Sequence, residues 1–201
     1  MASSSRFVRH VKWWFFVVPL LASVLLPIIP DSGLFEISDA ESQSAIRALG
    51  DERASNAVDT TNRLFRRFFV TTGALQASLS AGGEDGFDAD GTRSFAQGWA
   101  RHFWMLMYRA LYRAVVMKAW LSGTLVLCTA AWVDGAMRRK IHAAAAGFAS
   151  PLSFHLAMHG VLMVLGSAFV VLVLPVSLIA QWWTILAIFL PLLLWIVSSS
   201  A

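Results

Sequence analysis

Apolar residues are gathered along this chain in four blocks that are long enough, or nearly so, to cross a lipid bilayer. A transmembrane helix needs about 20 mostly apolar residues, within a range of roughly 17 to 25. The predicted spans are residues 13–30, 119–136, 157–180 and 182–198. The pattern predicts an all-α, polytopic membrane protein with four transmembrane helices and a helical extracytoplasmic segment between the first two.

The first block, WWFFVVPLLASVLLPII, begins at Trp13 and follows a basic N-terminal stretch, residues 1–12. It exceeds the apolar core of a signal peptide, about 7 to 15 residues, and lacks a clear small-x-small cleavage site. An uncleaved anchor is therefore favoured over a signal peptide. The second block is slightly short, so Lys118 and Arg138 must lie along it with their charges at the interface.

The last two blocks are separated by little more than the stretch PVSLIAQWW, so we expect a tight antiparallel hairpin. Tryptophans at both ends of the final block match the aromatic belts of a membrane interface. Residues 137–156 are expected to form a basic cytoplasmic loop before this hairpin. Ser150 and Pro151 are typical of the N-cap and first position of a helix.

Residues 31–100 are polar enough to lie outside the bilayer, and their pattern is helical. Ser38 is a candidate N-cap with Glu41 at the capping-box distance, and Gly50 can end that helix. A second helix is expected over residues 52–79. Its RLFRRFFV run places arginines beside phenylalanines, which leaves open contact with lipid or a partner, or packing against the first helix.

The stretch 82–91 is acidic and rich in glycine, which predicts a loop. It does not fit a calcium-binding loop, because aligning its acids to that pattern places Gly86 and Gln97 at the first and last ligand positions. Beyond it, residues 101–118 predict an amphipathic helix that leads into the second span.

On that amphipathic helix His102, Arg109 and Arg113 fall within about 40° of one another at 100° per residue. Two alternatives remain open for the two arginines. They could contact phosphates of the outer leaflet, or they could face a partner subunit.

Composition agrees with a membrane protein. Hydrophobic residues make up 57% of the chain and charged residues 14%, whereas soluble domains carry about 25% charged residues. Residues 31–100 hold eleven acidic residues and six arginines, and the rest of the chain holds ten basic residues and one acid. The positive-inside rule then places both termini in the cytoplasm and residues 31–100 on the outer side of the membrane.

The net charge of +4 does not indicate nucleic-acid binding. The basic residues flank membrane spans and form no patch interleaved with aromatic residues. No direct nucleic-acid partner is expected, and the lipid bilayer is the expected environment.

Asp134 is the one acid outside the acidic segment, and basic residues follow it closely. An acid four residues before Arg138 is in the favourable order for a helical ion pair. With Arg139 and Lys140, this stretch is either a stop-transfer border or a docking surface for a cytoplasmic protein. Two small-xxx-small pairs on the same predicted helix suggest a packing seam: Ala119 with Gly123, and Ala131 with Gly135.

Candidates for chemistry are few. His155 and His159 share a helical face and are the weak candidates for metal ligands, but the H-E-x-x-H pattern is absent. No nucleotide-binding or hydrolase motif occurs, so neither an enzyme nor a cofactor is expected. A small transporter or channel subunit is the alternative, although no charge is clearly placed at the centre of the last three spans.

The run WVDGAMRRKIH, together with this order of spans, resembles the domain-of-unknown-function 4400 family. These are inner-membrane proteins encoded among the transfer genes of integrating conjugative elements and conjugative plasmids. The family's V-D-G-x-x-R-R pattern matches Val133, Asp134, Gly135, Arg138 and Arg139. The chain departs from the family in its alanine-rich loop, where His155 is the nearest counterpart of the family's histidine, and in lacking a basic C-terminus.

The resemblance implies a non-enzymatic inner-membrane component of a conjugative DNA-transfer apparatus, of the type IV secretion or coupling kind. Its expected role is to anchor or scaffold partner subunits. The expected partners are other membrane subunits of the complex and a cytoplasmic ATPase or coupling protein.

Overall fold

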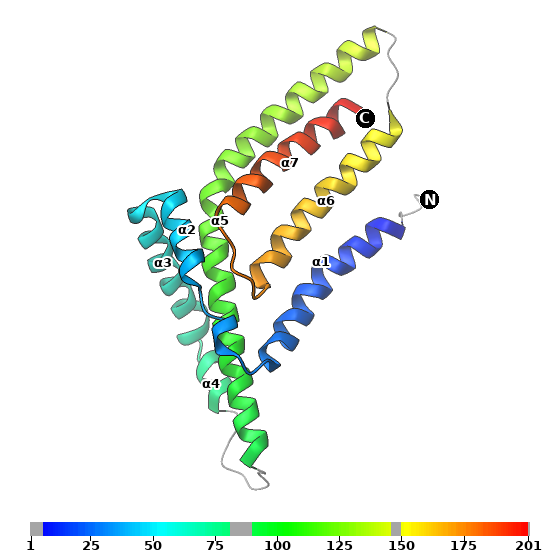
Figure 1. The fold of residues 1–201 in the computed structure, drawn as a ribbon. Coiled ribbons are helices and arrows are strands. Elements are labelled where there is room, and N and C mark those ends of the chain that lie inside the picture. The colour runs from blue at the N-terminus through cyan, green and yellow to red at the C-terminus, as the bar shows by residue number, and fades with distance from the viewer. Residues whose placement is uncertain (1–5, 81–89, 146–149, 201) are drawn as a thin grey trace. The chain divides into compact units, whose positions relative to one another are not determined.

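The structure, a computed structural model, describes residues 6–80, 90–145 and 150–200. Over these residues the chain is all-α and contains no strand, which confirms the all-α part of the predicted fold class. The helices are α1 (Arg6–Leu25), η1 (Leu26–Ile28), η2 (Ser32–Leu34), α2 (Asp39–Leu49), α3 (Asp51–Phe65), η3 (Arg66–Val70), α4 (Ala74–Ser80), α5 (Asp90–Ala144), α6 (Pro151–Val173) and α7 (Gln181–Ser200), shown in Figure 1.

Among the residues that the structure describes, three helices are long and apolar enough to cross a membrane: Arg93–Ala144, Pro151–Val173 and Gln181–Ser200. Only 6%, 17% and 22% of their most apolar windows are buried, so few of these residues are enclosed within the chain. The predicted first span is different. Its described apolar part, Phe15–Ile28, is shorter than a full span, and α1 gives way to the 3-10 helix η1, which contains Pro27.

The chain divides into two compact units. The first unit comprises Met1–Phe16, Met117–Val170 and Gln181–Ala201, and the second comprises Val17–Val116 and Val171–Ala180. Helix α5 contributes residues to both.

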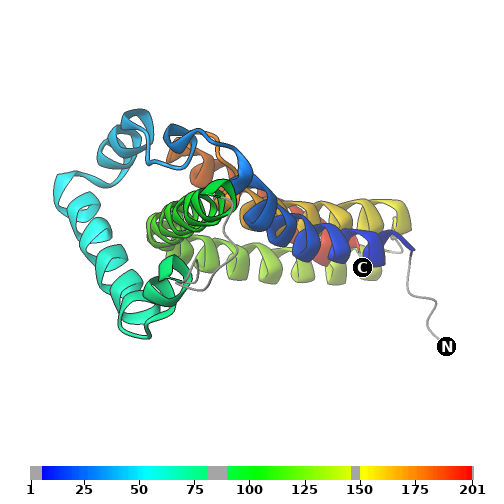
Figure 2. The ribbon, with the colours of Figure 1, turned by 90° about the horizontal axis from the view of Figure 1, so that it is seen from below.

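In the first unit, α7 lies between the second half of α5 and α6 (Figures 1 and 2). Ala157 and Val161 of α6 and Val197 of α7 form its buried core. Leu193 of α7 packs against Gly160, where an added Cβ would lie 2.9 Å from a leucine methyl carbon. These contacts hold α6 and α7 as the antiparallel hairpin that the sequence predicts.

In the second unit, α2, α3 and α4 lie along the first half of α5 (Figure 1). The Ser38 side chain caps α2 by accepting a hydrogen bond from the backbone of Glu41, and Gly50 ends the helix at a φ of 83°. Both predictions are confirmed. A positive φ is easily adopted by glycine, which lacks a Cβ.

The helix expected over residues 52–79 is divided into three. Helix α3 passes into the π-helix η3, and Gly73, with a φ of 75°, separates η3 from α4. Two aromatic residues of the RLFRRFFV run pack on α5, whereas the third, Phe68, is 55% exposed. Phe65 and Phe69 lie 6.1 and 5.1 Å from the Trp104 ring, centroid to centroid.

Helix boundaries near the predicted cytoplasmic loop also differ from expectation. Helix α5 continues through Arg138, Arg139 and Lys140 to Ala144, although residues 137–156 were expected to be a loop. Helix α6 begins at Pro151, as its sequence signal indicates, with the Ser150 hydroxyl accepting a hydrogen bond from the backbone of Ser153.

Helix α6 ends at Val173, seven residues before the predicted end of that span at 180. Leu174 precedes Pro175, and the residue before a proline is disfavoured in helical conformation. Residues 174–180 therefore run as an irregular segment between α6 and α7. Most of the acidic loop expected over 82–91 lies outside the described residues, and its last two residues begin α5.

Candidate functional site

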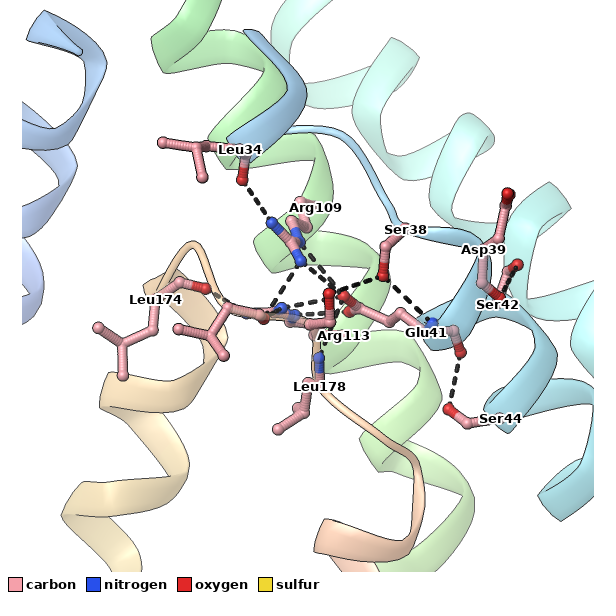
Figure 3. A network of polar contacts seen from close by, with 12 residues as sticks. Leu34, Ser38, Asp39, Glu41, Ser42, Ser44, Arg109, Arg113, Leu174 and Leu178 are labelled. Atoms are coloured by element: carbon pink, nitrogen blue, oxygen red, sulfur yellow. Dashed lines mark hydrogen bonds and ion pairs between the residues drawn. The ribbon is translucent and has the colours of Figure 1, made fainter. Parts of the chain in front are cut away.

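A buried ion cluster in the second unit joins the first turn of α2 to α5 (Figure 3). The Glu41 carboxylate accepts hydrogen bonds from Arg109 Nη2 at 2.9 Å and from Arg113 Nε at 2.6 Å. Arg113 Nη2 also donates to Glu41 Oε2, at 3.0 Å. The three side chains are only 2–4% exposed. Arg109 and Arg113 are four residues apart, so both reach the same side of α5.

Local sequence explains how Glu41 is placed. It lies three residues after the N-cap Ser38, where its backbone N–H is held by the Ser38 hydroxyl. Its side chain does not complete a capping box, because both carboxylate oxygens face the guanidinium groups. An acid in the first helical turn is also stabilised by the helix dipole.

Arg113 binds the end of α6 as well as Glu41. Arg113 Nη1 donates to the carbonyl oxygens of Val171 at 2.8 Å and Leu174 at 2.6 Å, and its Nη2 donates to that of Val176. The last carbonyls of a helix lack intrahelical partners. A positively charged donor satisfies them and is favoured by the helix dipole. Arg113 therefore caps the C-terminus of α6.

Arg109 makes a similar set of contacts on the other side of the cluster. Its Nη1 donates to the Leu34 carbonyl at 2.6 Å, and its Nη2 donates to the Val176 carbonyl at 3.1 Å. The chain before α2 and the segment after α6 are thus attached to one side chain of α5.

The irregular segment 174–180 is fastened to α2 by further bonds. The Leu178 backbone N–H donates to Glu41 Oε2 at 3.4 Å, and the Ala180 N–H donates to the Ser44 hydroxyl at 3.0 Å. The Ser38 hydroxyl donates to that of Ser177 at 2.9 Å. Polar groups freed where α6 ends are consequently paired inside the second unit.

The charges in the cluster are unequal, since one carboxylate faces two guanidinium groups. Burial by itself would raise the pKa of Glu41, but the hydrogen bonds and positive charges of Arg113 and Arg109 outweigh burial and hold it below 4.5. Glu41 is therefore ionised at neutral pH. The remaining positive charge is shared with backbone carbonyl dipoles.

The cluster corrects the expectation that Arg109 and Arg113 contact lipid phosphates or a partner subunit. Each residue is 2% exposed and is occupied by this chain's own acceptors. His102, predicted on the same face, stacks on Phe35 at 5.1 Å between ring centroids and lies 3.2 Å from the Pro27 carbonyl. The polar face of the predicted amphipathic helix is thus turned inward.

A second cluster lies in the first unit, in the stretch that resembles a family motif. The Trp195 indole of α7 donates to Asp134 Oδ2 at 2.6 Å. The Arg138 guanidinium carbon lies 4.9 Å from the centroid of the same ring, a cation–π distance. Between Asp134 and Arg138, both described, no ion pair forms, so the predicted direct pair is wrong and Trp195 contacts both. Arg139 and Lys140 are exposed.

The two small-residue pairs have different surroundings. At Gly135 an added Cβ would lie 1.9 Å from Ser198 Oγ and 2.7 Å from the Trp195 carbonyl oxygen. At Gly123 nothing lies within 4 Å of that position. Gly135 therefore packs on α7, whereas Ala119 and Gly123 are exposed.

The histidine pair lies on α6. His155 is exposed and meets the ring of Phe154 edge to face at 5.5 Å between centroids. Within residues 6–80, 90–145 and 150–200, no group of three or more histidine, cysteine or acidic side chains is arranged to hold a metal ion.

Sequence reasoning missed Glu41 and Trp195 as cluster members. Glu41 is separated from its arginines by 68 and 72 residues, and Trp195 lies 61 residues from Asp134. Helical periodicity shows only which residues close together in the sequence share a helix face, so it cannot predict contacts between residues more than 60 positions apart. Pro175 was the available signal, because a proline that ends a helix leaves carbonyls in need of donors.

Comparison with known proteins identifies the family. A family model described as IncC plasmid conjugative DNA transfer protein DtrJ-like matches residues 32–200. No curated protein and no solved structure matches the chain significantly. The match supports the expected connection with conjugation, while the domain-of-unknown-function 4400 family itself is not shown. Since the matched residues include both clusters and well over half of the chain, it belongs to the DtrJ-like family of IncC plasmid conjugative DNA transfer proteins.

Proposed function

We propose that this protein is a non-enzymatic integral component of a conjugative DNA-transfer apparatus in the bacterial inner membrane, where it anchors or scaffolds partner subunits. The observation that carries the proposal is the combination of a DtrJ-like match over residues 32–200 with three long apolar helices whose apolar windows have few buried residues. Exposed apolar surface of this extent is stable in lipid and unfavourable in water.

The proposed topology has four spans, with both termini in the cytoplasm. Lys118 and Arg138 are about 20 helical residues apart on α5, which corresponds to about 30 Å and to the thickness of the hydrocarbon core. The shorter apolar helix Phe15–Ile28 would complete the fourth span with local thinning of the bilayer. The acidic segment, residues 31–100, then lies outside.

The internal clusters support a scaffolding role in place of a chemical one. Glu41, Arg109 and Arg113 are saturated by contacts within the chain and hold three segments together. The groups left for partners are at the surface. Exposed Arg139 and Lys140, at the end of α5, are suited to an acidic surface of a cytoplasmic ATPase or coupling protein.

The test is gene deletion in the donor, with complementation by wild-type and variant genes, and transfer frequency as the readout. We expect deletion to abolish or sharply reduce transfer. An Arg139→Ala, Lys140→Ala double variant should insert normally but restore transfer poorly, and an Arg47→Ala, Arg53→Ala pair in the exported segment is the matched control. Unchanged transfer after deletion would contradict the proposal.

A further inference from the structure

The second unit contains an apolar pocket of about 440 Å³ that lies apart from the ion cluster. Its lining comes from the chain before α2, from α3 and α4, and from α5. The aliphatic and aromatic members are Phe35, Ile37, Phe65, Leu75, Leu79, Trp104, Met105 and Tyr108. Small-molecule sites in proteins are mostly apolar concavities of roughly 300 to 1,000 Å³. The volume and chemistry of this pocket are therefore those of a ligand site.

The polar atoms of the pocket's aromatic walls are already engaged. The Trp104 indole donates to Ser78 Oγ at 2.7 Å, and the Tyr108 hydroxyl donates to Asn62 Oδ1 at 2.7 Å. The rings consequently present apolar surface to the pocket and offer no free donor. An occupant of the interior must therefore be hydrocarbon, because a polar group placed there would lose its hydrogen bonds to water.

Two charged residues complete the lining, Glu36 and Arg101. Both are exposed, whereas neighbouring Phe35 is buried, so the charges lie on the open side of the pocket. The mouth thus presents one anion and one cation above an apolar interior. This arrangement is complementary to an amphiphile that has an apolar chain and a head with both charges.

Apolar surface next to the pocket indicates where such a molecule would come from. The Trp99 indole donates to the Val24 carbonyl, and His102 contacts the Pro27 carbonyl. The end of α1 therefore lies beside residues of α5 that come shortly before the lining residue Trp104. Leu20 and Leu25 of α1 are 68% and 54% exposed. Under the proposed function these side chains face lipid.

From these observations we infer that the pocket binds one acyl chain of a zwitterionic phospholipid. Arg101 contacts the phosphate and Glu36 contacts the ammonium group of the head. The inference rests on the proposed membrane location, and it adds a lipid-binding site to a unit that the sequence describes only as helical and acidic.

The experiment uses the full-length protein in nanodiscs that contain phosphatidylethanolamine with a photoactivatable group near the end of one chain. After irradiation, labelled peptides are mapped by mass spectrometry. We expect labelling of peptides containing Leu75, Leu79 or Trp104. The variant Leu75→Trp fills the pocket, so labelling there should fall by about tenfold, because several chain methylenes lose their burial. The control is Val126→Trp on α5, where the side chain is 69% exposed.

Head-group recognition is tested with the same photoactivatable chain on phosphatidylglycerol. Arg101→Gln should weaken pocket labelling by both lipids, whereas Glu36→Gln should weaken labelling only by phosphatidylethanolamine. A Met105→Trp variant fills the pocket from another wall and repeats the test should Leu75→Trp fail to fold.

The outcomes separate this inference from the proposed function. Labelling of α6 and α7 without labelling of the pocket, or pocket labelling that survives both filling variants, would overturn the lipid site and leave the membrane assignment intact. An absence of labelling throughout the chain would overturn both. A photoactivatable residue at Leu79 that crosslinks in native membranes to a protein, and not to lipid, would also overturn the lipid site.

Discussion

At the scale of single residues, Glu41 stabilises the second unit because several polar groups form their hydrogen bonds and ion pairs with its carboxylate. Two guanidinium groups and a backbone N–H meet its two oxygens, and one of these guanidinium groups, that of Arg113, also caps the end of α6. Replacing a buried ion pair by apolar residues can be neutral, but removing one partner leaves the other charge buried and uncompensated.

We therefore predict that Glu41→Gln lowers the free energy of unfolding by about 3 to 5 kcal/mol, the range for breaking a buried pair from one side. Thermal and denaturant unfolding of the purified protein in detergent would measure the loss. Glu52→Gln, on the exposed first turn of α3, is the control and should change stability by less than about 0.5 kcal/mol. Equal effects of the two variants would contradict the importance of the cluster.

Glu41 also predicts how stability depends on pH. Its pKa in the folded protein is lower than the ordinary value of 4.5, so the unfolded chain binds its proton more readily. The stabilisation is complete above about pH 4.5 and is lost as the pH falls through the lower, folded pKa. Unfolding measured from pH 7 to pH 3 should show this loss in the wild type. A Glu41→Gln variant should show a shallower decline, and parallel curves would contradict the assignment.

At the scale of helices, glycine sets the distance between α5 and α7. Gly135 approaches the α7 backbone so closely that a Cβ would lie 2.7 Å from the Trp195 carbonyl oxygen, and this backbone atom cannot move as a flexible side chain does. The same helix contains Gly123, where the corresponding position is open. The two glycines provide a matched pair within one helix.

Gly135→Ala should therefore destabilise the first unit by about 1 to 3 kcal/mol, as expected for overpacking a tight contact. Gly123→Ala should be neutral or stabilising by up to about 1 kcal/mol, because alanine is the better helix former. Unfolding in detergent, followed by the fluorescence of tryptophans near the seam, distinguishes the two. Similar losses in both variants would indicate that α5 and α7 do not meet at Gly135.

The features that the sequence predicts correctly are those set by residues a few positions apart in the chain. Ser38, Gly50 and Pro151 mark helix ends through bonds to residues at most four positions away, and the structure places helix ends at all three. Helical periodicity placed Arg109 and Arg113 together correctly. It could not show what faces them, because a charged stripe reads the same whether it meets water, lipid phosphate or a buried carboxylate.

The short range of helical periodicity also explains why residues 52–79 were predicted as one helix but form three. Residues 52–79 have a continuous helical composition, yet η3 and Gly73 interrupt them. Phe65 and Phe69 pack on Trp104 next to this interruption, and those rings belong to elements far apart in the chain. Tertiary contacts of this kind override local propensity.

At the scale of the whole molecule, the distribution of charge and the distribution of apolar surface support the same proposed topology. The acidic residues lie almost entirely within 31–100, and exposed basic residues lie at the end of α5. Few residues in the apolar windows of the long helices are buried within the chain. In the proposed topology, a bilayer surrounds those helices, and the positive-inside rule favours a cytoplasmic position for the basic end of α5 and an external one for the acidic segment.

This topology is testable with single cysteines in a Cys128→Ser background, which removes the chain's one native thiol. A cysteine at Glu52 should react with a membrane-impermeant maleimide in spheroplasts, because the proposed topology places α3 outside. A cysteine at Lys140 should react only after the inner membrane is opened, since the same topology places the end of α5 inside. Labelling of Lys140→Cys in intact spheroplasts would reverse the orientation. Release of the protein by carbonate washing would instead contradict the proposal that its helices span the bilayer, because apolar helices surrounded by lipid are not extracted by a change of pH.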